Sequence, residues 1–210
     1  MDFKARARAY FTAVNAYDAA AIERMVDEDY VQHNPFVATG RAAFVALLPK
    51  LKAHGSRIRN LRMLQDGRHV VMHHRWENAA PFGHDEVDAF HVIRFDADSR
   101  IAEHWSVMAE ASPSHEGATP IADLDRTEAN KARASELFPY ASPDLAYRTQ
   151  HKVFGEGNLC LSVSEGLRLG VPSAIYDLLR FEDGRLAERW RIVQEIPTTG
   201  LANENTMFGF

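Results

Sequence analysis

One stretch of the sequence occurs twice, and this repeat constrains the fold more than any other feature. VIRFDADSRIAEHWSVMAE at residues 92–110 returns as LLRFEDGRLAERWRIVQE at 178–195, with one residue fewer in the turn. In each copy two runs of alternating side chains flank a short polar turn, which is typical of an antiparallel hairpin. A weaker echo precedes it, because DGRHVVMHH at 66–74 corresponds to EGNLCLSVS at 156–164. The chain is therefore predicted to hold two related units.

The second copy is shorter than the first. The helix-like segment at 126–138 is a counterpart of the helix that precedes the strands of the first copy, but the second copy has no match to the first two helices or to the His-Asn-Pro segment. We expect a complete domain over 1–112, a polar linker over 113–124, and a truncated, structural repeat over 125–210. A unit that lacks its first helices must cover its sheet with another part of the chain or with a partner. The two sheets are therefore expected to pack together as an intrachain pseudo-dimer, and further homo-oligomerisation stays open.

The first third of the chain has a helical pattern. Apolar side chains recur at three- and four-residue spacing from Phe3 to Tyr17, and Asp18 is placed to cap a second short helix. A third helix is predicted around residues 44–51, with Pro49 kinking it or ending its regular part. Strands and turns follow from about residue 57. Helices packed on one face of an antiparallel sheet make an α+β fold.

Composition narrows the partners. The formal net charge of the 210-residue chain is −5, which argues against nucleic acid as a partner. The single cysteine, Cys160, excludes an internal disulfide and fits a reducing compartment. No apolar run approaches the length of a membrane span, and the first ten residues lack the apolar core of a signal peptide. We expect a cytoplasmic protein without a membrane partner.

Four motifs, in order, carry a resemblance to a known family. They are YVQHNP…G before a helix, DG…V…H in a hairpin, RF…SRIAEHW in the last hairpin, and QEIP…NENTMF at 194–208. Together they resemble the SnoaL-like polyketide cyclase branch of the NTF2-like superfamily, present as a tandem with an incomplete second copy. The resemblance implies an NTF2-like (cystatin-like) cone of curved antiparallel sheet covered by helices and duplicated within the chain. Its open end would be a pocket for a small apolar molecule.

The resemblance also implies where the polar groups of the pocket lie. They fall on His33, Asn34, His73 and His91, and on the last strand. There the cyclases have an acid/base aspartate directly after EHW, whereas this chain has Ser106.

The strand pattern itself points to His91, because it is the only polar side chain on the small apolar face of residues 86–95. His104 shares the face of Ser106. By contrast, His115 lies in the polar linker and is expected to be solvated.

Two functions stay open. The first is an acid/base enzyme that performs aldol condensation, isomerisation or dehydration on a small apolar carbonyl compound without a cofactor. A neutral histidine would be its base, since Ser106 cannot serve alone. The catalytic residues would be His91, with His33 and Asn34 as polarising donors, and the substrate-binding residues His73, His104 and Ser106. The second function is non-catalytic binding of a small hydrophobic ligand.

A metal site built from several of these histidines is a less favoured third interpretation, because they show no ligand-spacing motif. In the second copy Val163 and Arg191 replace His73 and Ser106, and Asp177 replaces His91. Only the first unit is therefore expected to bind a ligand.

Overall fold

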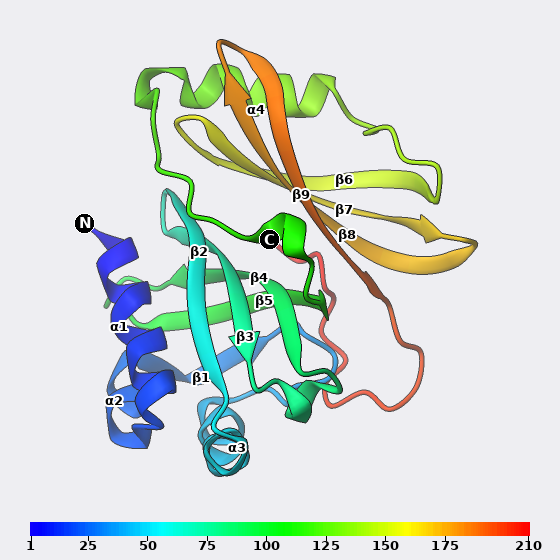
Figure 1. The fold of residues 1–210 in the computed structure, drawn as a ribbon. Helices are drawn as coiled ribbons and strands as arrows, with labels where there is room; N and C mark the ends of the chain where they lie inside the picture. Colours follow the sequence, from blue (N-terminus) through cyan, green and yellow to red (C-terminus); the bar gives the residue numbers. More distant parts are fainter.

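A computed structural model describes residues 1–210 and contains two sheets, one in each half of the chain (Figure 1). The first sheet has five strands in the order β1-β5-β4-β3-β2. Neighbouring strands are antiparallel except β1, which pairs in parallel with β5. The strands are β1 (Val26–Gln32), β2 (Arg57–Asp66), β3 (His69–Glu77), β4 (Glu86–Phe95) and β5 (Ile101–Glu110).

The second sheet is a four-stranded antiparallel meander in the order β6-β7-β8-β9. Its strands are β6 (Leu145–Glu156), β7 (Leu159–Arg168), β8 (Val171–Glu182) and β9 (Arg185–Glu195). The repeated hairpin therefore forms β4–β5 in one sheet and β8–β9 in the other. The α+β fold class is confirmed, and the layout of the two sheets fits a duplication.

The helices begin and end where local chemistry predicts. In α1 (Phe3–Ala16) and α2 (Ala19–Met25) the first turns are capped by the carboxylates of Asp2 and Asp18, which accept hydrogen bonds from backbone N–H groups three residues on. α3 (Arg41–His54) ends at Gly55 in the left-handed conformation. The only longer helix of the second half is α4 (Thr127–Glu136), and three 3₁₀ turns are η1 (Ala80–Phe82), η2 (Pro113–His115) and η3 (Leu124–Arg126). No helix is long and apolar enough to cross a lipid bilayer.

Three apolar layers hold the molecule together. The helices α1–α3 cover one face of the first sheet, and the two sheets pack face to face through their other faces (Figure 1). The layer between the sheets contains Trp105 and Trp190 from the two equivalent hairpins. α4 covers the outer face of the second sheet through a smaller cluster. Each unit therefore has helices outside and sheet inside.

Residues beyond β9 return to the first unit (Figure 1). The side chain of Asn203 donates to the carbonyl oxygens of Asn34 and Val37, both at 2.7 Å, and Asn205 donates to the carbonyl of Gln32 at 2.9 Å. Phe210 stacks on Trp105 with 4.6 Å between ring centres. This tail completes the first unit, although it follows the second in sequence.

The local structure differs from the sequence pattern at two places. Strands were expected only from about residue 57, but residues 26–32 form β1, an edge strand with three acidic residues and no clean alternation. Of the two alternatives for Pro49, an end of the helix is excluded, because α3 continues to His54. The proline removes only one N–H donor, and the apolar face of Phe44, Leu48 and Leu51 stays buried.

Candidate functional site

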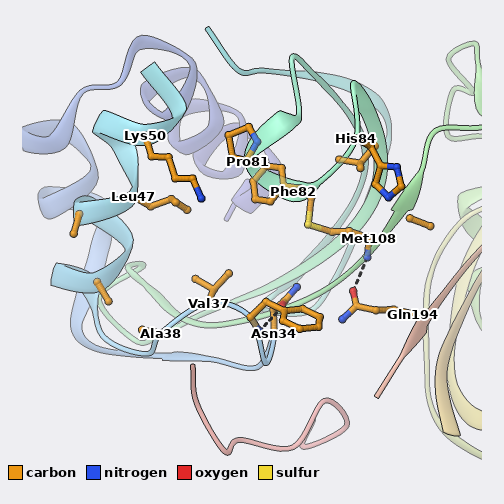
Figure 2. A pocket seen from close by; sticks show the side chains of 15 residues that line it. Asn34, Val37, Ala38, Leu47, Lys50, Pro81, Phe82, His84, Met108 and Gln194 are labelled. Atoms are coloured by element: carbon orange, nitrogen blue, oxygen red, sulfur yellow. Dashed lines mark hydrogen bonds between the residues drawn. The ribbon is translucent and has the colours of Figure 1, made fainter. Parts of the chain in front are cut away.

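A pocket of about 640 Å³ opens at the end of the first unit, between α3, η1 and the loop after β1 (Figure 2). Its walls are mostly apolar, and no carboxylate lines it. The polar lining side chains are Asn34, Lys50, His84 and Gln194. The remaining lining residues are Phe36, Val37, Ala38, Ala43, Ala46, Leu47, Pro81, Phe82, Val87, Met108 and Ala109. Size and lining are those of a site for a small organic molecule.

Asn34 forms the polar inner part of this pocket. Its side-chain nitrogen donates to the hydroxyl of Ser106 at 3.0 Å, and its side-chain oxygen accepts from the N–H of Phe36 at 3.0 Å. Its own backbone N–H donates to the side-chain oxygen of Gln32. The residue before Pro35 is thus held on three sides, which explains why a rigid loop carries an asparagine here.

A buried chain of hydrogen bonds lies behind Ser106. His91 and Ser106 are direct cross-strand partners, so their side chains share a face and lie about 5 Å apart. Nδ1 of His91 lies 2.8 Å from Nε2 of His104, and Nδ1 of His104 lies 2.8 Å from the hydroxyl of Tyr30. The indole N–H of Trp76 donates to Nε2 of His91 at 3.4 Å. The chain thus runs from Trp76 through two imidazoles to Tyr30.

The obligate donor at one end of the chain, Trp76, decides the tautomers. An indole N–H can only donate, so Nε2 of His91 is the acceptor and its proton sits on Nδ1. That proton is donated to Nε2 of His104, whose own proton points at Tyr30. A second proton on His91 would face the N–H of Trp76. Burial lowers the pKa of both histidines well below the ordinary value, and the pair is neutral.

The structure brings four of the predicted site residues together. His91, His104 and Ser106 lie on the helix-facing side of the sheet, as their strand parity predicts, and Asn34 contacts Ser106. Of these four, only Asn34 lines the pocket. Met108 lies on the same face two residues after Ser106, and it lines the pocket on the side of the histidines.

His33 lies outside this group. Its ring stacks on Trp105 with 4.4 Å between centres, on the face of β5 that points to the second sheet. Nδ1 donates to the carbonyl of Thr206 at 2.7 Å, and Nε2 lies 3.3 Å from the carboxylate of Glu103. His33 therefore anchors the tail rather than facing the pocket.

The expectation that His73 shares the face of His91 was wrong. His91 pairs with Met72 across β3 and β4, so His73 points to the opposite face and packs on Phe90. The neighbour His74 takes the inner side, 5.2 Å from His91 between ring centres, and burial lowers the pKa of His74 to about 3. Sequence reasoning missed Tyr30, Gln32, His74 and Trp76. A polar residue inside an otherwise apolar strand run was the one available signal, and it marks His73 and His74 alike.

For His115, too, the prediction from local composition was wrong. It was expected to be solvated, but it is buried, with Nδ1 3.1 Å from a carboxylate oxygen of Asp88. Asp88 accepts two hydrogen bonds from Arg75, and one from the backbone N–H of Ser112. Burial raises the pKa of Asp88, but the nearby His115 imidazole and the hydrogen bonds from Arg75 and Ser112 outweigh it and lower the pKa to about 2.

His73, Asp88 and His115 form a cluster whose possible ligand atoms lie within 4.8 Å of one another. Two histidines and a carboxylate are a familiar metal-binding set. Here, however, Arg62 donates to Nδ1 of His73 at 3.1 Å, so the ring proton is on Nε2, the atom a metal would need. Both oxygens of Asp88 already bind Arg75. The contacts of this cluster hold residues 112–116 against the sheet, and the cluster does not have the free ligand atoms of a metal centre. The four-histidine metal site is not assembled, because His33 and His73 point away from His91.

The equivalent place in the second unit is filled by an ion pair. Nε of Arg191 donates to the carboxylate of Asp177 at 2.7 Å, and the hydroxyl of Tyr147 donates to the same carboxylate at 2.5 Å. Asp177 is fully buried. These two charged residues occupy the positions of Ser106 and His91, so no neutral histidine pair exists there.

A family model described as a SnoaL-like domain matches residues 7–104. A cystatin-fold protein from Novosphingobium aromaticivorans has 18% identity and a TM-score of 0.45, covering 51% of this chain and 98% of that one. IdmH, a candidate polyketide cyclase from Streptomyces antibioticus, has 18% identity and a TM-score of 0.44, covering 51% and 92%. A SnoaL-like protein of unknown function from Burkholderia thailandensis has 18% identity and a TM-score of 0.43, covering 51% and 93%.

No curated protein matches the sequence. The family model covers the helices of the first unit and its sheet as far as His104. Over residues 7–104, the first unit of this chain is thus similar to the SnoaL-like domain that its motifs predict.

Proposed function

We propose that the first unit binds a small apolar molecule with a carbonyl-type oxygen, and that the second unit supports this site. The observation that carries the proposal is the pocket itself, about 640 Å³ with mainly apolar walls and the amide of Asn34 at its inner part. Apolar walls supply affinity, and a few fixed polar groups orient the ligand. The absence of carboxylates from the lining removes the groups that would repel an electron-rich oxygen.

A second candidate is an acid/base enzyme for a small carbonyl compound, with His91 as its base. The observation that favours it is the neutral His91–His104 pair directly behind Ser106. An imidazole in its neutral form can act as a proton acceptor, and removal of a proton beside a carbonyl begins aldol condensation, isomerisation and dehydration.

Binding is the better supported of the two because of geometry. Both ring nitrogens of His91 are engaged, one by Trp76 and one by His104. A general base needs a free lone pair within hydrogen-bond reach of the substrate. Catalysis would therefore require Met108 and Trp76 to move when the ligand enters. Met108 is flexible enough for such a shift.

One ligand tests both candidates. We would titrate the protein with 2-acetylnaphthalene, an apolar methyl ketone, and follow tryptophan fluorescence. Ala43→Phe fills the pocket from α3, whereas Ala42→Phe places the same ring on the exposed neighbour that does not line it. Binding that is lost in Ala43→Phe and kept in Ala42→Phe supports the pocket. No saturable binding to the wild type would overturn the proposal.

Deuterium exchange of the same methyl group, followed by NMR in D₂O, tests for a base. Exchange faster than in buffer, and lost in His91→Gln, would establish the enzyme. Binding with exchange at the buffer rate would establish the non-catalytic function.

A further inference from the structure

Gln194 is the only pocket-lining residue that comes from the second unit. It lies near the end of β9, where that strand passes beside β5. The edge of β5 is open at this point, because β1 pairs with it only as far as His104. The side-chain oxygen of Gln194 accepts a hydrogen bond from the backbone N–H of Met108 at 2.9 Å. This bond fixes which end of the amide is oxygen and which is nitrogen.

The nitrogen end of the Gln194 amide has no partner. Nε2 is buried and makes no hydrogen bond, and the residue is only 9% exposed. Buried amide groups are normally satisfied, so an unpaired one calls for an acceptor from outside the chain. Figure 2 shows the Gln194 amide at the edge of the pocket, with its oxygen toward Met108 and its nitrogen on the side of Asn34. By contrast, Asn34 already donates to Ser106.

The charged side chains around the pocket indicate which kind of hydrogen-bond acceptor the ligand carries. Lys50 and His84 line it at exposed positions, and Figure 2 shows the amino group of Lys50 directed over the cavity. With no carboxylate in the lining, the pocket favours a ligand of negative charge. Phe36 lines the same pocket and is 59% exposed, so its ring has room to move when a ligand enters.

We propose that the two units share one binding site, in which Nε2 of Gln194 donates a hydrogen bond to the carboxylate of a small apolar acid. This inference rests on the proposed small-molecule function of the pocket. It gives the second unit a part in recognition beyond support, because the donor that selects the ligand comes from β9.

Three probes of the same shape separate the contributions: 2-naphthoate, 2-acetylnaphthalene and 2-ethylnaphthalene. They offer a charged acceptor, a neutral acceptor and no acceptor. For the wild type we expect 2-naphthoate to bind most tightly and 2-ethylnaphthalene most weakly. Gln194→Glu keeps an oxygen for the N–H of Met108 and replaces the donor by a negative oxygen. Its affinity for 2-naphthoate should fall by about tenfold or more, the cost of one charge-assisted hydrogen bond and an added repulsion.

The matched control is Thr198→Glu, which adds the same charge at an exposed site beyond β9. It should leave all three affinities unchanged, and Gln194→Glu should leave 2-ethylnaphthalene within about twofold, since that probe has no acceptor. Gln194→Met, which removes donor and acceptor together, should also lose the preference for 2-naphthoate. If all three probes bind the wild type equally and Gln194→Glu changes none of them, the Gln194 inference is wrong while the pocket stands. If no probe binds, the proposed function fails and this inference with it.

Discussion

The guanidinium of Arg62 lies 3.6 Å from the centre of the Trp190 ring, and this contact joins β2 of the first sheet to β9 of the second. The same guanidinium donates to His73 at 3.1 Å, to the carbonyl of His115 at 2.9 Å and to the hydroxyl of Thr119 at 3.0 Å. One side chain therefore connects both sheets and the segment between them. Its planar shape allows stacking on one face and hydrogen bonding along its edges.

Replacing Arg62 by lysine should destabilise the protein by about 2–4 kcal/mol, because an ammonium cannot stack and reach all three acceptors. The measurement is the free energy of unfolding in urea. Arg59→Lys is the control, since Arg59 pairs with Glu77 and Glu116 at the surface and should change stability by less than about 1 kcal/mol. Equal effects of the two substitutions would contradict the role of Arg62.

Asp88→Asn should cost about 3–5 kcal/mol, because it leaves the buried guanidinium of Arg75 without its carboxylate. The same change should release residues 112–116, and faster amide hydrogen exchange there would report it. The exposed Asp98 serves as a control, and Asp98→Asn should alter neither quantity. Unchanged exchange in Asp88→Asn would show that other contacts hold residues 112–116 in place.

The buried histidines should make the protein acid-labile. Burial lowers the pKa values of His91 and His104 well below 6.5, that of His74 to about 3 and that of His73 to about 2. The unfolded chain therefore binds more protons than the folded one below pH 6.5, and stability falls as pH falls. Each histidine contributes about 1.4 kcal/mol per pH unit well below that value, until its own folded-state pKa is reached.

Urea titrations between pH 7 and 4.5 measure this slope. His91→Gln should reduce it by about 1.4 kcal/mol per pH unit, whatever the substitution costs at pH 7. His54→Gln, on an exposed side chain at the end of α3, should leave the slope unchanged. A wild-type slope that survives His91→Gln intact would mean that His91 is already charged in the folded protein.

Asp177→Asn should destabilise the protein by about 3–5 kcal/mol, since Arg191 would lose its buried partner. It should not change the affinity of the first-unit pocket for 2-naphthoate. Asp183→Asn, in the exposed turn between β8 and β9, is the stability control. A loss of binding in Asp177→Asn beyond the loss of folded protein would show that the two units are coupled through the second core.

The face of the sheet on which His73 lies could not be predicted from the sequence. In β4, small apolar side chains alternate with larger or charged ones, so the face of His91 could be predicted correctly. β3 is buried on both faces, and its sequence HVVMHHRW has no alternation to follow. Two adjacent histidines then differ only in register, which is set by pairing with β4. The choice between His73 and His74 was therefore not contained in the local pattern.

The predictions for β1 and for His115 were wrong for a different reason. Three acidic residues in Val26–Gln32 interrupt the apolar pattern typical of a strand. This strand is stabilised by parallel pairing with a segment more than seventy residues away. His115 lies in a run whose composition is that of a loop, yet Asp88 and Arg75 from the sheet hold it inside. In both cases the deciding contacts are long-range, whereas the helices and the hairpins depend on contacts nearby in sequence and were predicted correctly.

The return of residues 203–210 to the first unit has a consequence for synthesis on the ribosome. The segment around His33 and Asn34 emerges early, but its partners Asn203, Asn205 and Thr206 emerge about 170 residues later. At about 5–20 residues per second the nascent chain must wait roughly ten seconds or longer before this part of the first unit can close. During that time the segment around His33 and Asn34 lacks these partners while the second sheet is made. The contacts of the first unit are therefore completed only after the second unit has been synthesised.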